Sequence, residues 1–305
     1  MSPPIVFVCG ATGNQGGALI QHVLEHGVKV HAITRDLTSP AALNLQSQGV
    51  SLMEGDFDNQ ESLRKSMSGC TTLFLNASPN LKRLPAEAEH AKQVLAIAKE
   101  VNIQHIVYTS ALGTNNPEGL KNWDPRSLIG TAVLGKQVIE KEVRNGGFQT
   151  WTILRPGNFM TNFLYPFVSM YQGLVDKGIF TTAFTRETIL PMVDPNDIGK
   201  FAAAVVLDPV KFNQKEIEIA SQMMGIEAVM SDLSQAARKD LQVIFLSEQE
   251  IMEKVPQDLF IHGQLIMRDM AQFVDMEKVK EWNIELGTFP QFLRREKERI
   301  EKTYS

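Results

Sequence analysis

Short apolar runs alternate with segments of helical hydrophobic spacing along the first half of the chain. Residues 5–9 form a β-branched and aromatic run, which predicts a buried strand, and residues 18–24 carry apolar side chains at helical spacing. The same rhythm predicts further strands at 29–35, 50–54, 71–76, 105–110 and 150–155, with helices at 39–49, 85–101 and 131–144 and one after Asp58 that runs through Leu63 and Met67 to Gly69. Strict alternation of strand and helix requires right-handed crossovers and a parallel sheet, so we predict a doubly wound α/β fold.

The rhythm changes after Pro156. Strands are predicted at 188–193, 216–220 and 241–246, a helix begins at 194–197 and runs to Asp208, and helices dominate from Gly225 onward. We therefore expect residues 1–156, with 187–208 returning to them, to form one domain and 157–305 a smaller, mixed α/β lobe. Ligands of open α/β sheets bind at the carboxyl edge, over which we expect this lobe to fold and bind a substrate or a partner.

Glycines mark the turn between the first strand and the first helix. Gly10, Gly13 and Gly16 allow a sharp bend and the close approach of a pyrophosphate to the backbone amides. The N-terminus of the helix adds free N–H groups and the positive end of its dipole. A glycine triplet alone is weak support, but its place between a strand and a helix favours a Rossmann-type dinucleotide site over a purely structural turn.

The end of the second strand distinguishes two dinucleotides. Arg35 stands 19 residues after Gly16, about where an NAD site carries an acidic residue for the ribose 2′-hydroxyl. An arginine instead presents a planar, charged fork to a 2′-phosphate. Asp36 follows directly and could instead be the acidic residue that binds the ribose 2′-hydroxyl. A third interpretation is that Arg35 is an ordinary solvent-exposed arginine without a role in binding. We expect NADP(H).

Composition excludes several classes of function. A formal net charge of −5 over 305 residues provides no basic footprint for nucleic acid or an anionic membrane. The longest clean apolar run, 201–207, is too short to span a bilayer, and four residues before the first strand leave no room for a signal peptide, so we expect a cytoplasmic protein. Cys9 and Cys70 are expected to be reduced structural residues. No metal-ligand spacing and no nucleophile turn is present, so no metal is expected.

Four stretches together resemble the NmrA-like family. They are the glycine turn at 10–16, Thr-Arg-Asp at 34–36, Gly-Asp-Phe-Asp at 55–58 and Asp-Pro-Asn-Asp-Ile-Gly at 194–199. This family belongs to the atypical short-chain dehydrogenase/reductase superfamily, alongside the isoflavone-reductase-like enzymes. The resemblance spans about residues 5–208, and Asn14-Gln15 inside the turn is its sharpest mark. It implies an NADP-type cofactor.

The resemblance also implies the contacts of that cofactor. The pyrophosphate would lie on 12–15, the 2′-phosphate on Arg35, the adenine near 56–57, and the nicotinamide side near 76–78 and 156–159. The implied cofactor-binding set is Gly10, Thr12, Gly13, Asn14, Gln15, Gly16, Arg35, Asp56, Phe57, Asn76, Ala77, Ser78, Lys136, Pro156, Asn158 and Phe159.

Catalysis in this superfamily commonly uses a Tyr and a Lys four residues apart on one helix, with a Ser on the preceding strand. Lys136 and Ser110 occupy the corresponding places, but Ala132 stands where the tyrosine would be. The usual mechanism is therefore excluded, although hydride transfer is not, and isoflavone-reductase-like relatives also lack that tyrosine. Lys136 either acts as a general acid or base, directly or through water, or only clamps the nicotinamide ribose.

Three other side chains offer a substitute proton donor. Tyr165 and Tyr171 follow the sixth strand, and His262 lies in the C-terminal lobe. Aromatic residues after a strand more often form the hydrophobic wall of a helix or pocket, and a lone histidine is more often structural.

Two functions follow from this reading. The first is an NADPH-dependent oxidoreductase that reduces a small, hydrophobic carbonyl, enone, imine or quinone-like compound. Lys136 and Ser110 would stabilise the charge that develops on its oxygen or nitrogen. The second is a non-catalytic redox sensor that binds NAD(P)(H) and signals through a protein partner, a role that the missing tyrosine suits. The sequence does not determine the substrate, the stereochemistry of transfer or the oligomeric state.

Overall fold

The computed structural model describes residues 4–77, 83 and 86–305, so Ser78, one of the predicted cofactor contacts, lies outside the described residues. The chain divides into two compact units. The first takes in the chain up to Thr114 together with 132–155 and 195–217, and the second takes in 115–131, 156–194 and 218–305. The helix that follows Asp194 thus belongs to the first unit, whereas the strand just before it belongs to the second.

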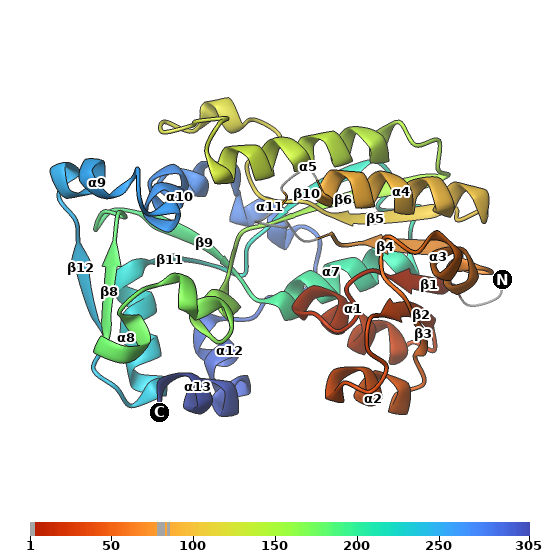
Figure 1. The fold of residues 1–305 in the computed structure, drawn as a ribbon, viewed down its shortest axis with the longest axis horizontal. Coiled ribbons are helices and arrows are strands. Elements are labelled where there is room, and N and C mark those ends of the chain that lie inside the picture. The colour runs from red at the N-terminus through yellow and green to blue at the C-terminus, as the bar shows by residue number, and fades with distance from the viewer. Residues whose placement is uncertain (1–3, 78–82, 84–85) are drawn as a thin grey trace. The chain divides into compact units, whose positions relative to one another are not determined.

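A seven-stranded sheet forms the centre of the first unit, in the order β10-β6-β5-β4-β1-β2-β3 (Figure 1). Its strands are β1 (Ile5–Val8), β2 (Lys29–Thr34), β3 (Ser51–Glu54), β4 (Thr72–Leu75), β5 (His105–Thr109), β6 (Thr150–Pro156) and β10 (Lys215–Ile219). Neighbours from β3 through β6 all pair in parallel, with Val6 of β1 beside Val30 on one side and Thr72 on the other. The strand order reverses between β1 and β4, which confirms the doubly wound α/β fold and places the switch point beside the glycine turn.

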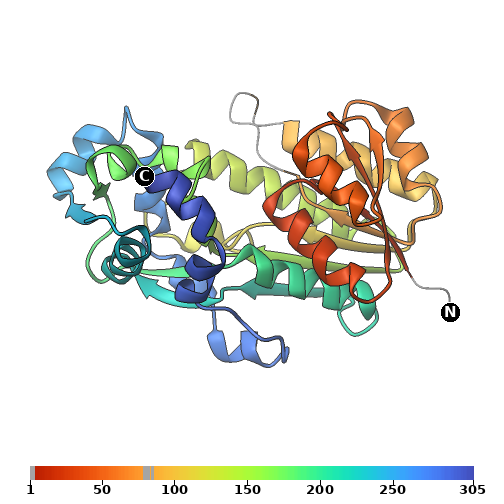
Figure 2. The same ribbon diagram turned by 90° about the horizontal axis from the view of Figure 1, so that it is seen from below.

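Helices cover both faces of this sheet (Figures 1 and 2). One face carries α1 (Asn14–Leu24), α2 (Pro40–Ser47) and α7 (Pro195–Leu207), and the other carries α3 (Gln60–Met67), α4 (Ala86–Glu100) and α5 (Leu128–Arg144). Gly199 lets α7 lie directly against α1, because a Cβ at this position would stand 2.6 Å from the carbonyl carbon of Ala18. The predicted cap of α2 is confirmed, since the Ser39 side chain accepts a hydrogen bond from the Ala42 N–H.

The core on the α3–α5 face follows the period-2 alternation of the strands. Alternate residues of the central strands point into it: Phe7, Cys9, Leu73, Leu75, Ile106, Tyr108 and Ile153. The apolar stripe of α4 packs against them through Ala91, Val94, Leu95 and Ala98. Because the central strands are buried on both faces, they read as continuous apolar runs in the sequence.

The second unit is a mixed α/β assembly with two small sheets, ordered β11-β9-β7 and β12-β8. Its strands are β7 (Asn158–Phe159), β8 (Ile179–Thr182), β9 (Ile189–Val193), β11 (Gln222–Gly225) and β12 (Gln242–Phe245). Its helices are α6 (Leu174–Lys177), α8 (Ile226–Ala237), α9 (Glu248–Lys254), α10 (Leu259–Met267), α11 (Met276–Lys280), α12 (Phe289–Arg295) and α13 (Lys297–Tyr304), with 3₁₀ turns η1 (Pro117–Gly119), η2 (Met160–Phe163), η3 (Phe167–Met170) and η4 (Met270–Phe273). Within residues 4–77, 83 and 86–305, none of the helices is long and apolar enough to cross a membrane.

Candidate functional site

The turn between β1 and α1 is a tight loop that depends on its glycines. Gly10 has a φ of +66°, in the left-handed region that favours glycine, and its carbonyl accepts a hydrogen bond of 2.9 Å from the Gly13 N–H. A Cβ on Gly16 would stand 2.3 Å from the Gly10 carbonyl oxygen, closer than real atoms approach. Glycine is therefore required at both ends of the turn, as the sequence predicts.

No side chain of the described residues caps the start of α1. Gly13 is its N-cap and provides no side-chain hydrogen bond, and the first turn contains no acidic residue. Thr12 and Gly13 are exposed, while Asn14 and Gln15 are half-buried. Backbone N–H groups at the positive end of an 11-residue helix, with neither a cap nor a carboxylate over them, fit the pyrophosphate of a dinucleotide.

Asn76, at the end of β4, ties the turn to the neighbouring strands. Its Oδ1 accepts hydrogen bonds from Gln15 Nε2 (3.3 Å) and Thr109 Oγ1 (3.2 Å), which fixes the orientation of both amides. Gln15 Oε1 is buried and has no hydrogen-bond partner within the described part of the chain. Such an acceptor fits a hydroxyl or amide donor of a ligand and does not fit a phosphate oxygen. Ala77 follows as a buried residue.

Arg35 and Asp36 follow β2 and differ sharply in their surroundings. Arg35 is exposed, and no ion pair or hydrogen bond involves its side chain within the described residues. The Asp36 carboxylate instead accepts hydrogen bonds from the Thr38 hydroxyl (2.6 Å) and the Thr38 N–H (2.8 Å), and these lower its pKa. Asp36 thus stabilises its own turn through Oδ1, and the assignment of Arg35 to the 2′-phosphate stays a prediction.

The turn after β3 lies beside Arg35. The Gly55 N–H donates to the Thr34 carbonyl at 2.9 Å, which joins the ends of β3 and β2. Asp56 caps its own loop, since its Oδ1 accepts from two backbone N–H groups at 3.0 Å each. Phe57 is half-buried, and its carbonyl accepts from Gln93 Nε2 at 2.6 Å. The adenine contacts implied for these two residues stay a prediction.

Lys136 has a partner that the sequence reading missed. Its Nζ lies 2.6 Å from Oε1 of Glu87, which enters from the first turn of α4. The side chains are 12% and 2% exposed, respectively, so the ion pair is nearly enclosed. Ala132, one turn earlier on α5, confirms that no phenol stands beside this amine on its own helix.

Ser110 borders a second buried charge cluster. Its Oγ lies 3.2 Å from Thr114 Oγ1, and it is close enough to Glu140 to help lower the pKa of that carboxyl. Arg155 forms a bidentate pair with Glu140, with N–O distances of 2.9 and 2.8 Å. Burial alone would raise the pKa of Glu140, but the hydrogen bonds and charge of Arg155 outweigh burial and lower it.

Arg144 and Glu216, the latter on the edge strand β10, complete this cluster. It then contains two arginines and two glutamates. Arg144 donates to Glu140 and to Glu216 at 2.6 Å each, and Arg155 also pairs with Glu216. Glu140 follows Lys136 by one helical turn, so the cluster carries the polar layer from α5 to β10. The i,i+4 spacing of Glu140 and Arg144 was the one signal of this cluster in the sequence.

Tyr108 is a buried tyrosine that sequence reasoning did not single out. Its side chain is fully buried on β5, and its hydroxyl has no hydrogen-bond partner within residues 4–77, 83 and 86–305. Burial raises its pKa well above the usual value, the nearby carboxylates of Glu87 and Glu140 raise it further, and the neighbouring Ser110 hydroxyl lowers it in part. The phenol is therefore neutral and lies near the carboxylates of Glu87 and Glu140.

Three predicted cofactor contacts belong to the second unit. Pro156 ends β6 and is buried, and Asn158 and Phe159 form β7. Asn158 Oδ1 accepts a hydrogen bond from Asn162 Nδ2 at 3.1 Å, and a Cβ on Gly157 would stand 2.2 Å from the Pro191 carbonyl oxygen. The segment is therefore tightly packed within its unit, and its contacts with a cofactor stay a prediction.

The substitute proton donors considered above have different surroundings. Tyr171 packs in an aromatic core, with its ring centroid 5.4 Å from that of Phe163 and 5.1 Å from that of Phe180. Burial raises its pKa, so the hydrophobic-wall interpretation fits it better. Tyr165 is 43% exposed, and His262 is half-buried on α10.

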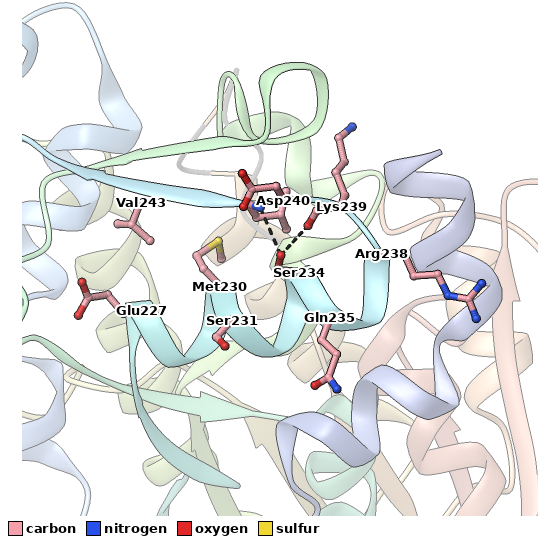
Figure 3. A pocket seen from close by; sticks show the side chains of 10 residues that line it. Glu227, Met230, Ser231, Ser234, Gln235, Arg238, Lys239, Asp240 and Val243 are labelled. Carbon is pink, nitrogen blue, oxygen red and sulfur yellow. Dashed lines mark hydrogen bonds between the residues drawn. The ribbon is translucent and has the colours of Figure 1, made fainter.

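A concave surface in the second unit lies over α8, with a volume of about 740 Å³ (Figure 3). Ser234 donates to the Lys239 carbonyl at 2.5 Å and accepts from the Leu241 N–H at 3.3 Å, so it closes the turn after the helix. Lys239 Nζ in turn donates to the Val175 carbonyl at 2.6 Å. These polar groups satisfy one another, and we find no reactive constellation there. Across the described part of the chain, no group of three or more His, Cys, Asp or Glu side chains is placed to hold a metal ion.

Comparison with known proteins agrees with this geometry. The sequence profile of the NmrA-like family matches residues 4–293. The NmrA-like family domain-containing oxidoreductase malD of Malbranchea aurantiaca is 26% identical over 247 residues, covering 75% of this chain and 71% of that protein.

Two solved structures share the fold. The NADPH-dependent quinone oxidoreductase QOR2 of Escherichia coli, complexed with NADPH, has a TM-score of 0.74 at 19% identity, covering 95% of this chain and 99% of that chain. The Citrobacter sp. triphenylmethane reductase, complexed with NADP(H), has a TM-score of 0.73 at 20% identity, covering 96% and 99%. With a family match over nearly its whole length, the chain belongs to the NmrA-like family.

Proposed function

We propose that this chain is an NADP(H)-dependent oxidoreductase that reduces a small, hydrophobic carbonyl, enone, imine or quinone-like compound. The observation that carries the proposal is the combination of an uncapped helix start at the glycine turn with Arg35, which is exposed and has no partner among the described residues. The first fits a pyrophosphate and the second a 2′-phosphate. Relatives named as oxidoreductases, and a shared fold with reductases crystallised with NADPH or NADP(H), support the same assignment.

The residues of the first unit divide the work of binding. Residues 12–15 would hold the pyrophosphate, through backbone N–H groups other than that of Gly13, which donates to the Gly10 carbonyl, and Arg35 would hold the 2′-phosphate. The unpaired Gln15 Oε1, fixed through Asn76, would accept a hydrogen bond from a hydroxyl or amide of the bound cofactor. When bound, NADPH supplies a hydride to the substrate.

Lys136 is the residue that we assign to the developing charge. A lysine ammonium has three N–H donors, of which one points at Glu87, so two remain for a substrate oxygen or nitrogen or for the nicotinamide ribose. We propose Ser110 as the second polar group on this side of the site. Because its hydroxyl lies between Thr114 and Glu140, it orders the polar layer beside Lys136.

The alternative, a non-catalytic redox sensor that acts through a protein partner, is favoured by one observation. Ala132 provides no proton donor beside Lys136, and the phenol of Tyr108 is enclosed. A sensor would bind the dinucleotide through the same glycine turn and would reduce no substrate.

The test is an NADPH-oxidation screen at 340 nm over panels of quinones, enones and imines. The proposal predicts turnover with at least one acceptor, which Lys136→Ala abolishes while weakening NADPH binding only modestly. Tight NADPH binding without turnover on any acceptor, together with a partner affinity that depends on the redox state of the cofactor, would favour the sensor.

A further inference from the structure

We propose that Glu87 is the positioning residue of Lys136: its carboxylate holds the ammonium in one place, so that the remaining N–H donors are available to the ligand. The inference rests on the proposed function and assigns a residue that neither the family pattern nor the sequence motifs single out.

The geometry of the pair supports a directional role. Glu87 is almost completely enclosed, whereas the lysine side chain is 12% exposed, so the carboxylate is the more deeply buried of the two groups. Their 2.6 Å contact is the single hydrogen bond of each side chain among the described residues. One donor of the ammonium is therefore directed inward and the other two outward.

In the part of the chain that the structure describes, no other side chain holds the Lys136 ammonium. Tyr108 is the neighbouring polar side chain on β5, and its raised pKa keeps it neutral. Glu140, one turn along α5, is already paired with Arg155 and Arg144. Among residues 4–77, 83 and 86–305, Lys136 is thus the one ion-pair partner of Glu87, and Glu87 is the one hydrogen-bond partner of the Lys136 side chain.

A purely structural role is the competing explanation. Buried ion pairs contribute little net stability compared with apolar residues of the same volume, so stability is a weak reason for this one. A lysine has a flexible four-carbon stem, and an anchor at its end removes much of that freedom before a ligand arrives. The two roles predict different results when the charge of Glu87 is removed and its shape is kept.

The experiment compares the wild type with Glu87→Gln, Lys136→Met and the double variant. For each protein we would measure thermal unfolding, NADPH affinity by fluorescence titration, and kcat and KM with an acceptor found in the screen. Glu89→Gln is the matched control, because Glu89 lies on the same turn of α4 and pairs with Arg83 at an exposed position. We expect Glu87→Gln to lower kcat by about 10- to 100-fold, the worth of one charged hydrogen bond, with NADPH affinity changed less than about threefold. In the Lys136→Met background the same substitution should change NADPH affinity and any residual kcat less than about twofold.

Several outcomes overturn the proposal. Equal kcat values for wild type and Glu87→Gln would do so, as would a loss of kcat that Glu89→Gln matches. A loss of thermal stability with unchanged kinetics would assign the pair a structural role only. If the wild type itself fails to bind NADPH, the proposed function fails, and the role of Glu87 fails with it. If the wild type binds and turns over but Glu87→Gln matches it, the role of Glu87 alone fails.

Discussion

Replacing Arg35 by serine should separate the two dinucleotides. The guanidinium is exposed and has no partner within the described chain, so the substitution removes no contact of the folded protein and should leave its stability unchanged. The neighbouring Asp36 carboxylate already accepts two hydrogen bonds from Thr38 and is not expected to compensate.

The size of the effect follows from the exposure of Arg35. A phosphate monoester carries about −1.5 to −2 charges at pH 7, and one charge pair at about 4 Å in water is worth about 1 kcal/mol. Screened attraction alone therefore contributes about 1.5–2 kcal/mol, and charge-assisted hydrogen bonds raise this to about 3 kcal/mol. The Kd for NADPH should rise by about 10- to 100-fold, because each 1.4 kcal/mol is tenfold.

Fluorescence titrations of wild type and Arg35→Ser with NADPH and with NADH measure this difference. We expect the Kd for NADH to change by less than about twofold, and the advantage of NADPH in the wild type to shrink at about 0.5 M salt, where exposed charges are screened. Arg64→Ser is the control, since Arg64 is an exposed arginine paired with Glu100 away from the turn. Equal losses for both dinucleotides, or no loss for NADPH, would refute the assignment of Arg35 to the 2′-phosphate.

Three further predictions follow from the same structure. Gly16→Ala should lower the free energy of unfolding by about 1–3 kcal/mol and remove most of the NADPH affinity, because the added Cβ would meet the Gly10 carbonyl. Gly17→Ala, whose Cβ would lie 3.6 Å from the nearest atom, should change neither quantity, and denaturant unfolding and NADPH titration measure both. Arg155 lowers the pKa of Glu140, so the stability that this pair contributes is complete above the unfolded-state pKa of 4.5 and is lost as the pH falls through the lower folded-state pKa. Glu140→Gln should lower the free energy of unfolding by up to about 3–5 kcal/mol at pH 7, and its unfolding curves from pH 7 to 3 should depend less on pH than those of the wild type. Tyr108→Phe removes a buried hydroxyl without a partner, so we expect the unfolding free energy to stay equal or rise by about 1 kcal/mol, and a loss above about 1 kcal/mol would contradict the buried, unpaired phenol.

Local signals were sufficient to predict the first unit. The apolar runs and helical stripes of residues 5–155 predict β1–β6 and the intervening helices to within about three residues at most ends, because each signal depends on a few neighbouring residues. The glycine turn was equally readable, since the sharp bend at Gly10 and the close contact at Gly16 depend on glycine itself.

The sequence did not predict the contacts between residues that are far apart along the chain. The strand at 189–193 was predicted, but not its place in a separate sheet between β7 and β11, because strand pairing over such distances leaves no local mark. Glu87 and Lys136 are 49 residues apart and meet only because α4 and α5 pack side by side on one face of the sheet. Asp36 shows the same limit at short range: its sequence position suits a ribose, whereas its carboxylate caps its own turn.

The central claim is that the start of α1 binds the pyrophosphate of a dinucleotide and that Arg35 binds its 2′-phosphate. Isothermal titration calorimetry of the wild-type protein with NADPH, NADP⁺, NADH and NAD⁺ tests it most directly. We predict saturable binding of both phosphorylated forms, at least about tenfold tighter than of the unphosphorylated ones. An absence of binding heat from all four dinucleotides, with no change in thermal unfolding on their addition, would contradict it.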